Sequence, residues 1–195
     1  MDYRNERMDT LIINTFYNCL EKEDFSAITV GKLSEEAKIN RSTFYRHFED
    51  KYQLRDCVID EIVAYFVNWL EVDFLDMDIA HDKKYSPTLK QSLESIFARR
   101  REMEILWKQH MLGRNVFEEM VNGGARKIEK SIWQNSAISA SKKKYADWYA
   151  KLLVNNMLVS IRWWFEHSDT VTAVQITNMM RQHMIMGTIP TLKNT

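Results

Sequence analysis

The chain has 195 residues, with 27 Lys and Arg balanced by 27 Asp and Glu, so its formal net charge is zero. Hydrophobic residues make up 45% and charged residues 28%, which is a globular composition and excludes a disordered chain. The neutral total excludes a uniformly basic protein, so nucleic-acid binding would require a local basic patch. Only 5 Gly and 2 Pro are present, which favours a mostly helical protein over one rich in turns.

Several features of the sequence indicate the cellular compartment of the protein. The first ten residues are polar and charged, unlike a signal peptide, and no apolar stretch approaches the roughly 18 residues of a membrane span. Cys19 and Cys57 lie far apart within apolar helical patterns, so we expect buried free thiols in a reducing environment. The sequence therefore predicts a soluble cytoplasmic protein with no membrane contact.

The first 50 residues predict a run of helices. Apolar residues recur at three- and four-residue spacings over 8–20, as in an amphipathic helix. Short helices are expected over 30–37 and 41–48, with Thr29 and Asn40 as their N-caps. Because only a few residues separate these two short helices, the segment is organised as a helix-turn-helix.

Apolar pairs reinforce these helix starts. Ile28 with Leu33, and Ile39 with Phe44, have the spacing of a hydrophobic staple. A later helix is predicted to start after Asp50, with Gln53 completing a variant of the capping box.

The rest of the chain also follows helical periodicity. A fourth helix is expected over about 51–75, and residues 76–86 are the best linker candidate. Further helices are predicted over 87–98, 102–111, 115–134, 141–167 and 172–186, with the glycine pair at 123–124 as a candidate bend. The predicted fold class is all-α, in two parts: residues 1–50 and residues 51–195.

A family resemblance covers residues 25–54, which read FSAITVGKLSEEAKINRSTFYRHFEDKYQL. This segment resembles the DNA-binding signature of the TetR family, F-x-x-x-T-V-x-x-I-A-x-x-A-G-V-S-x-x-T-F-Y-x-H-F-x-x-K-x-x-L. The matching residues are Phe25, Thr29, Val30, Ala37, Thr43, Phe44, Tyr45, His47, Phe48, Lys51 and Leu54. The resemblance implies an N-terminal three-helix DNA-binding domain, followed by a larger helical domain for ligand sensing and dimerisation.

Two positions depart from the family pattern. Lys38 stands where the turn usually has glycine, so it must take an uncommon backbone conformation or alter the turn. Leu33 and Ser34 replace the usual Ile-Ala, which is a minor change in the core.

Residues of the second and third helices are the candidates for DNA contact. A helix fits the major groove, where Arg41 is able to bond a guanine or hold a phosphate, and Thr43 suits a thymine methyl. The local charge is favourable, since residues 38–55 contain five Lys and Arg against two acidic residues. The predicted contacts, some implied only by the resemblance, are Thr29, Arg41, Ser42, Thr43, Tyr45, Arg46, His47 and Lys51. The alternative for each is an ordinary solvated helix face.

The C-terminal region is rich in Trp, Met and Phe, which line apolar pockets but also fill plain cores. The candidate pocket residues are Trp69, Phe97, Trp107, His110, Met111, Trp133 and Trp148. The family layout places a dimer interface on the last two long helices, with Trp163, Trp164, Ile176 and Met180 as candidates. Residues 149–164 also resemble regulators of dihydroxyacetone kinase genes.

These observations predict a ligand-responsive regulator, a repressor in the first instance, that binds a palindromic duplex DNA operator as a homodimer. Its effector is a small molecule of unidentified structure. The alternative is a regulator of the same fold that acts through a protein partner. An enzyme is not expected, since the histidines lack metal-ligand spacing and no glycine-rich phosphate loop is present. No cofactor or metal is predicted.

Overall fold

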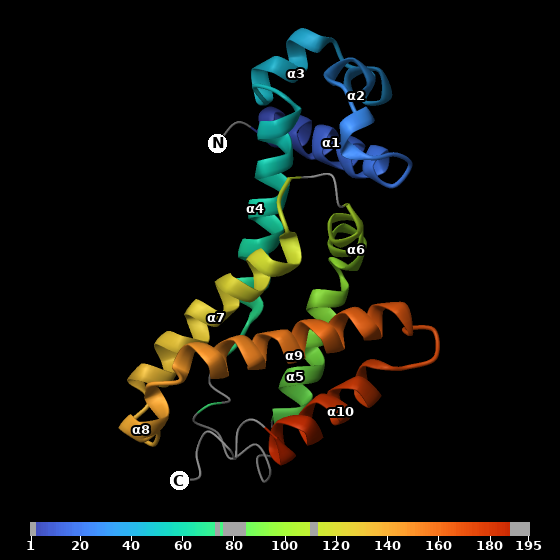
Figure 1. Ribbon diagram of the computed structural model, residues 1–195. Coiled ribbons are helices and arrows are strands. Elements are labelled where there is room, and N and C mark those ends of the chain that lie inside the picture. Colours follow the sequence, from blue (N-terminus) through green and yellow to red (C-terminus); the bar gives the residue numbers. More distant parts are fainter. Residues whose placement is uncertain (1–2, 73–74, 76–84, 110–112, 188–195) are drawn as a thin grey trace. The chain divides into compact units, whose positions relative to one another are not determined.

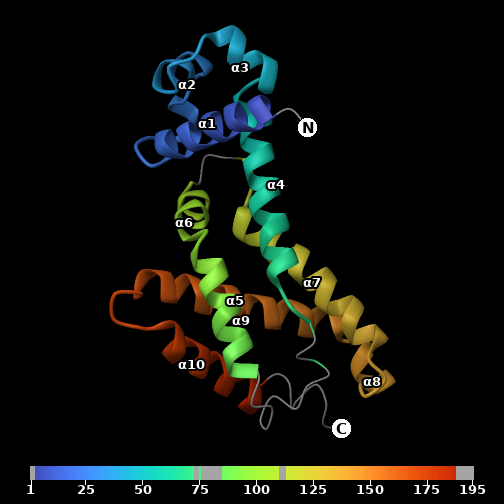
Figure 2. The ribbon, with the colours of Figure 1, turned by 180° about the vertical axis from the view of Figure 1, so that it is seen from behind.

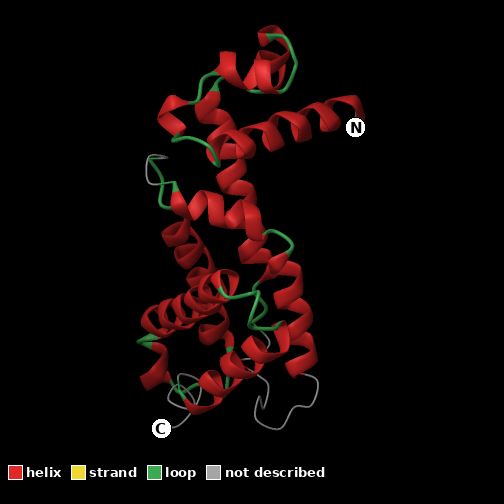
Figure 3. Cartoon of the chain, turned by 90° about the vertical axis from the view of Figure 1, so that its right-hand side faces the viewer, coloured by secondary structure: helices red, strands yellow, loops and turns green. Residues whose placement is uncertain are grey.

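The structure is a computed structural model that describes residues 3–72, 75, 85–109 and 113–187. Over these residues the chain forms α-helices and short 3-10 turns with no strand, which confirms the all-α fold (Figure 3). The elements are α1 (Tyr3–Leu20), η1 (Phe25–Ala27), α2 (Val30–Glu36), α3 (Arg41–His47), α4 (Lys51–Trp69), α5 (Tyr85–Phe97), α6 (Arg100–Lys108), α7 (Val116–Gln134), α8 (Ala140–Lys143), α9 (Ala146–Glu166) and α10 (Ala173–Met186). Most of the predicted linker lies outside the described residues.

The chain divides into two compact units. One comprises residues 1–63 and 101–116, and the other comprises residues 64–100 and 117–195. Helix α4 contributes residues to both units. The first unit thus includes most of α6, whereas the predicted functional boundary near residue 50 stays a prediction.

The first unit has a small core beneath the three N-terminal helices (Figure 1). Phe16 of α1, Leu33 of α2 and Phe44 of α3 are each at most 1% exposed. Ile28, in the connection before α2, is also fully buried. The ring of Phe25 meets that of Phe16 edge-on at 6.0 Å. Burial of these large side chains holds two helices of only seven residues each, which are too short to be stable alone.

The helix starts follow the predicted caps in part. Thr29 Oγ1 accepts a hydrogen bond from the Lys32 amide at 3.2 Å, and Asp50 Oδ1 accepts from the Gln53 amide at 2.8 Å. Gln53 reaches back to the amide of Glu49 instead of that of Asp50, so the capping box is displaced by one residue. Asn40 occupies the cap position of α3, but its side chain makes no cap hydrogen bond; the prediction of an Asn40 side-chain cap was wrong.

The second unit is built from α5 and α7 to α10. Helices α5 and α9 each pack against α10, as both Figure 1 and Figure 2 show. Thr172 and Gln175 form a complete capping box at the start of α10. Helix α7 runs unbroken through its glycine pair, where a Cβ on Gly124 would lie 3.1 Å from the Val154 methyl groups. Gly124 therefore permits a close approach of α7 to α9.

Two sequence predictions about these elements were wrong. The helix expected over 141–167 is divided into α8 and α9, because Tyr145 has φ −109° and ψ 18°, outside the helical range. Cys57 was expected to be buried but is exposed on α4, whereas Cys19 is buried and both thiols are free. Helices α5, α6 and α7 differ from their predicted starts by one or two residues, within the usual uncertainty of helix ends.

Candidate DNA-binding site

Helix α3 carries the most exposed candidate residues. Its core side is anchored by Phe44, which is fully buried, whereas Arg41, Ser42, Tyr45 and Arg46 are exposed. The ring of Tyr45 is 56% exposed and rests edge-on against Phe44, with centroids 5.7 Å apart. This exposed α3 face thus presents two guanidinium groups, a hydroxyl and a phenol to solvent.

Arg41 is supported by α2. A Cβ built on Gly31 would lie 2.7 Å from Nη2 of Arg41, so the guanidinium packs directly on the α2 backbone. The absence of a side chain at Gly31 creates the space for it. No pattern in the sequence indicates this role of Gly31.

Thr43 and Arg46 border a concave surface between α1 and α3. Nη2 of Arg46 donates to Oγ1 of Thr43 at 3.4 Å. We call this concavity the α1–α3 groove; it is lined by Asn5, Met8, Asp9, Lys38, Ile39, Asn40, Thr43, Arg46 and His47. The contributions of Asn5 and Asp9 were missed, because nothing in the sequence pairs the first helix with the recognition segment.

His47 faces α1 instead of solvent. Its side chain is only 9% exposed, and Nδ1 lies 2.7 Å from Oδ1 of Asp9. Asp9 is 44% exposed, so the pair lies at the edge of the unit. The ring nitrogen Nδ1 carries the shared hydrogen, because an ionised carboxylate can only accept.

Lys51 is engaged within the protein. Its Nζ donates to the carbonyl oxygens of Ile28 at 2.7 Å, Phe25 at 3.1 Å and Ser26 at 3.3 Å. The same ammonium lies 4.7 Å from the centre of the Phe25 ring. Lys51 thus neutralises the carbonyl end of η1, and its three donors are used without any phosphate.

The turn before α3 has an unusual backbone. Lys38 has φ +54°, the left-handed conformation that glycine adopts without strain. The turn therefore keeps its usual shape and the lysine accommodates it. Thr29 is exposed, but its hydroxyl oxygen already accepts from the Lys32 amide.

Comparison with known proteins identifies the module. Residues 12–57 match the family model for bacterial regulatory proteins of the tetR family, a span that runs from the middle of α1 into α4. The N-terminal module is that of the TetR family. The matched span includes the exposed α3 face, Gly31 and Lys38.

Several relatives share parts of this chain. An uncharacterized HTH-type transcriptional regulator of Bacillus subtilis strain 168, YxbF, is 26% identical over 105 residues, which are 52% of this chain and 28% of that protein. The repressor NalD of Pseudomonas aeruginosa aligns over 93% of this chain and 96% of its own, with a TM-score of 0.65 and 14% identity. A transcriptional regulator from Aquifex aeolicus VF5 aligns over 92% and 98%, with a TM-score of 0.60 and 14% identity. The two structures share the fold of this chain.

Outside its TetR-family module, the described members of the predicted pocket lie in different surroundings. Trp133 and Trp148 are 55% and 56% exposed, and Trp107 belongs to the other compact unit. Trp69 donates to the Ser92 carbonyl at 2.6 Å, and Phe97 packs against Trp164 at 4.9 Å. His110 and Met111 lie outside the described residues. The predicted pocket stays a prediction, and of its described members Trp133 and Trp148 face solvent.

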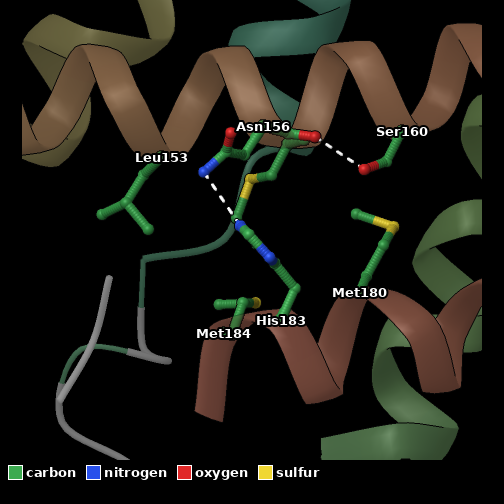
Figure 4. A pocket seen from close by; sticks show the side chains of 7 residues that line it. Leu153, Asn156, Ser160, Met180, His183 and Met184 are labelled. Carbon is green, nitrogen blue, oxygen red and sulfur yellow. Dashed lines mark hydrogen bonds between the residues drawn. The ribbon is translucent and has the colours of Figure 1, made fainter. Parts of the chain in front are cut away.

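A different, small pocket lies between α9 and α10 (Figure 4). Asn156 and His183 meet across it, with 3.2 Å between Asn156 Nδ2 and His183 Nε2. Ser160 donates to the Asn156 carbonyl at 2.7 Å on the same side. The lining residues are Leu153, Asn156, Met157, Ser160, Met180, His183 and Met184. Of these, Met180 was predicted from the sequence as a dimer contact.

Three of the four predicted dimer contacts are buried within the protomer. Trp164, Ile176 and Met180 are 4%, 2% and 6% exposed, so little of each side chain is accessible to a partner, and the interface stays a prediction. Trp163 is 39% exposed and stacks on the His167 ring at 4.2 Å. The apolar residues that α9 and α10 do expose are Trp148, Val159, Trp163, Val174, Met179 and Met186; we call them the α9–α10 apolar face.

The part of the chain that the structure describes lacks both a metal-binding cluster and a membrane-spanning helix. No group of three His, Cys, Asp or Glu side chains is arranged to hold a metal ion. No described helix is both long and apolar enough to cross a membrane.

Proposed function

We propose that this TetR-family protein is a transcriptional regulator that binds a palindromic DNA operator as a homodimer and responds to a small molecule. The observation that carries the proposal is the exposed α3 face. A buried Phe44 fixes the helix, and Arg41, Tyr45 and Arg46 are exposed on it. A helix presented in this way is suited to the major groove, where arginine reads guanine or holds phosphate.

The α9–α10 apolar face supports the dimer. Val159, Val174 and Met179 are each at least half exposed, although they are apolar. Several exposed apolar side chains on two neighbouring helices are typical of a protein interface. A two-fold axis through it would repeat the α3 face, so the operator would be an inverted repeat.

Two observations support the proposal that the protein represses transcription and responds to a ligand: the descriptions of its structural relatives and the course of α4. NalD is described as a repressor, and a further structural relative, SmeT, is described in complex with triclosan, at 12% identity and a TM-score of 0.65. Helix α4 runs from one compact unit into the other. We propose that an effector bound in the second unit moves α4, changes the spacing of the two α3 helices and releases the operator.

Selection of bound duplexes from a random DNA library by the purified protein tests this function. We expect an inverted repeat, bound with an affinity that falls steeply as salt rises. Arg46→Ala should weaken binding and reduce the salt slope by about one. Arg126→Ala, an exposed arginine of α7, is the matched control and should change neither quantity. A folded dimer that enriches no duplex at low salt would overturn the proposal.

One observation favours a second candidate, action through a protein partner. Trp133, Tyr145 and Trp148 are 55%, 48% and 56% exposed near the junction of α7, α8 and α9. Exposed tryptophan and tyrosine are enriched where proteins bind one another. Failure of the duplex selection would make this candidate the next to test.

A further inference from the structure

We propose that Asp9 is a positioning residue for DNA recognition, because its carboxylate holds His47 and thereby fixes α3 on α1. This inference rests on the proposed function, since it concerns how the α3 face is presented to an operator. It also reassigns His47, which the sequence placed among the DNA contacts.

The first argument is the direction of the His47 ring. Only 9% of the side chain is exposed, and the 2.7 Å approach of Nδ1 to Asp9 Oδ1 turns the ring toward α1. A residue that contacts phosphate needs a donor that reaches solvent, as Arg46 has on the adjoining exposed face. The Nδ1 of His47 instead hydrogen-bonds Asp9, which lies 38 residues away in the sequence.

The second argument is the place of the bond within α3. His47 is the last residue of the helix and lies between two apolar anchors, Phe44, which is fully buried, and the C-cap residue Phe48, which is 7% exposed. Apolar contacts are not directional, so these two anchors fix the buried side of α3 but leave the helix able to tilt on that side. A directional hydrogen bond at the helix end removes this freedom, because a charged acceptor makes the bond short and strongly oriented.

The third argument is the wall of the α1–α3 groove. Asp9 and His47 lie in it together with Lys38, Thr43 and Arg46. Arg46 also bonds Thr43 within the same wall, so a shift of the last turn of α3 would carry this guanidinium with it. The orientation of the DNA-facing side chains thus depends on a carboxylate that itself need not touch DNA.

The sharpest test compares two replacements of His47. Asn places an amide nitrogen close to the position of Nδ1, so His47→Asn keeps a donor for Asp9. Gln places its nitrogen close to the position of Nε2, so His47→Gln loses that donor but keeps one that points outward. Under the proposal, the His47→Asn protein retains its operator affinity, whereas the His47→Gln protein binds the operator roughly tenfold more weakly. The reverse order would show that His47 contacts DNA through Nε2 and would overturn the proposal.

Asp9 is tested with a matched control on the same helix. Asp9→Ala should weaken operator binding roughly tenfold with an unchanged salt slope, since no cationic contact to phosphate is removed. Glu6→Gln removes one negative charge from an exposed residue nearly one turn away and should not weaken binding. The Asp9→Ala and His47→Ala effects should not add in the double variant. Equal effects of Asp9→Ala and Glu6→Gln, or full additivity, would contradict a positioning role.

A measurement without DNA separates this proposal from the proposed function. Nitrogen NMR of His47 in the free protein should show Nδ1 protonated in the wild type, with a changed signal in Asp9→Ala and an unchanged one in Glu6→Gln. A wild-type spectrum without a protonated, hydrogen-bonded Nδ1 would overturn the proposal whatever the protein does with DNA. If the bond is present but no duplex is selected, the proposed function fails and the role of Asp9 in recognition falls with it.

Discussion

The ammonium group of Lys51 lies 2.7 Å from the carbonyl oxygen of Ile28, the residue that precedes the N-cap of α2. This bond ties the start of α4 to the connection between α1 and α2. The sequence offered Lys51 as a phosphate contact, whereas the structure directs its charge to three backbone carbonyls. Its contribution is therefore expected in the stability of the module.

Lys51→Met should lower the free energy of unfolding by about 1–2 kcal/mol, because the part-buried bonds to the carbonyl oxygens of Phe25 and Ile28 and the exposed bond to that of Ser26 lose their charged donor. Urea denaturation followed by circular dichroism measures the change. Lys22→Met is the control, since Lys22 is exposed just after α1. A loss of stability no larger than that of the control would show that the bonds to Ile28 and Phe25 contribute little.

Lys38→Gly should stabilise the protein by about 0.5–1 kcal/mol. A left-handed conformation costs a residue with a Cβ roughly 1–2 kcal/mol, and the greater freedom of glycine in the unfolded chain offsets part of the gain. Lys38→Ala keeps the strain and removes the charge, so its stability should stay near that of the wild type. Thermal unfolding compares the three proteins, and equal midpoints for glycine and alanine would contradict a strained turn.

Gly31→Ala should weaken DNA binding without lowering the stability of the protein. Alanine favours a helix over glycine, so α2 should be no less stable. The new Cβ would meet Nη2 of Arg41 at 2.7 Å, and the flexible guanidinium would move away. We expect weaker operator binding with unchanged or higher thermal stability. In an Arg41→Ala background the same change should have no effect on affinity; a persistent effect would mean that Gly31 acts by another route.

Val159→Asp should dissociate the proposed homodimer. Val159 is 58% exposed at the centre of α9, and a carboxylate there would have to be desolvated in an apolar interface. Sedimentation velocity should show a dissociation constant raised by at least about a hundredfold. Arg126→Asp, exposed on α7, is the control and should remain dimeric. A Val159→Asp protein that stays dimeric would place the interface elsewhere.

The two cysteines should differ in reactivity. Cys57 is exposed, whereas Cys19 is 2% exposed. Partial burial, followed by the nearby carboxylates of Glu61, Asp9 and Asp60, raises the pKa of the Cys57 thiol. Iodoacetamide should therefore label one site in the native protein, slowly at neutral pH and faster as pH rises, because the thiolate is the nucleophile. Mass spectrometry counts the labels, and two fast labels would show that α1 opens readily.

Local signals in the sequence determined the helix-turn-helix. Each of these signals depends on residues close together in the sequence. They are the Thr29 cap, the apolar residues Ile28, Leu33 and Phe44, and the short separation between the two helices. The position of Lys38 already implied either a left-handed residue or an altered turn, and the backbone takes the first form. These features need no knowledge of distant contacts, which is why the all-α fold and the order of the first helices were predicted.

Only the tertiary structure decided which way individual side chains face. Helix α9 carries apolar residues on adjacent positions, as at Trp163 and Trp164, so its periodicity cannot identify the buried side. Packing buries Trp164 and leaves Trp163 exposed. Likewise, the His47 side chain faces Asp9 and the Lys51 side chain faces Ile28. Both partners lie more than twenty residues away in the sequence and provide a hydrogen-bond acceptor, a carboxylate and a carbonyl oxygen. Such pairings arise when helices pack together, and no local pattern in the sequence records them.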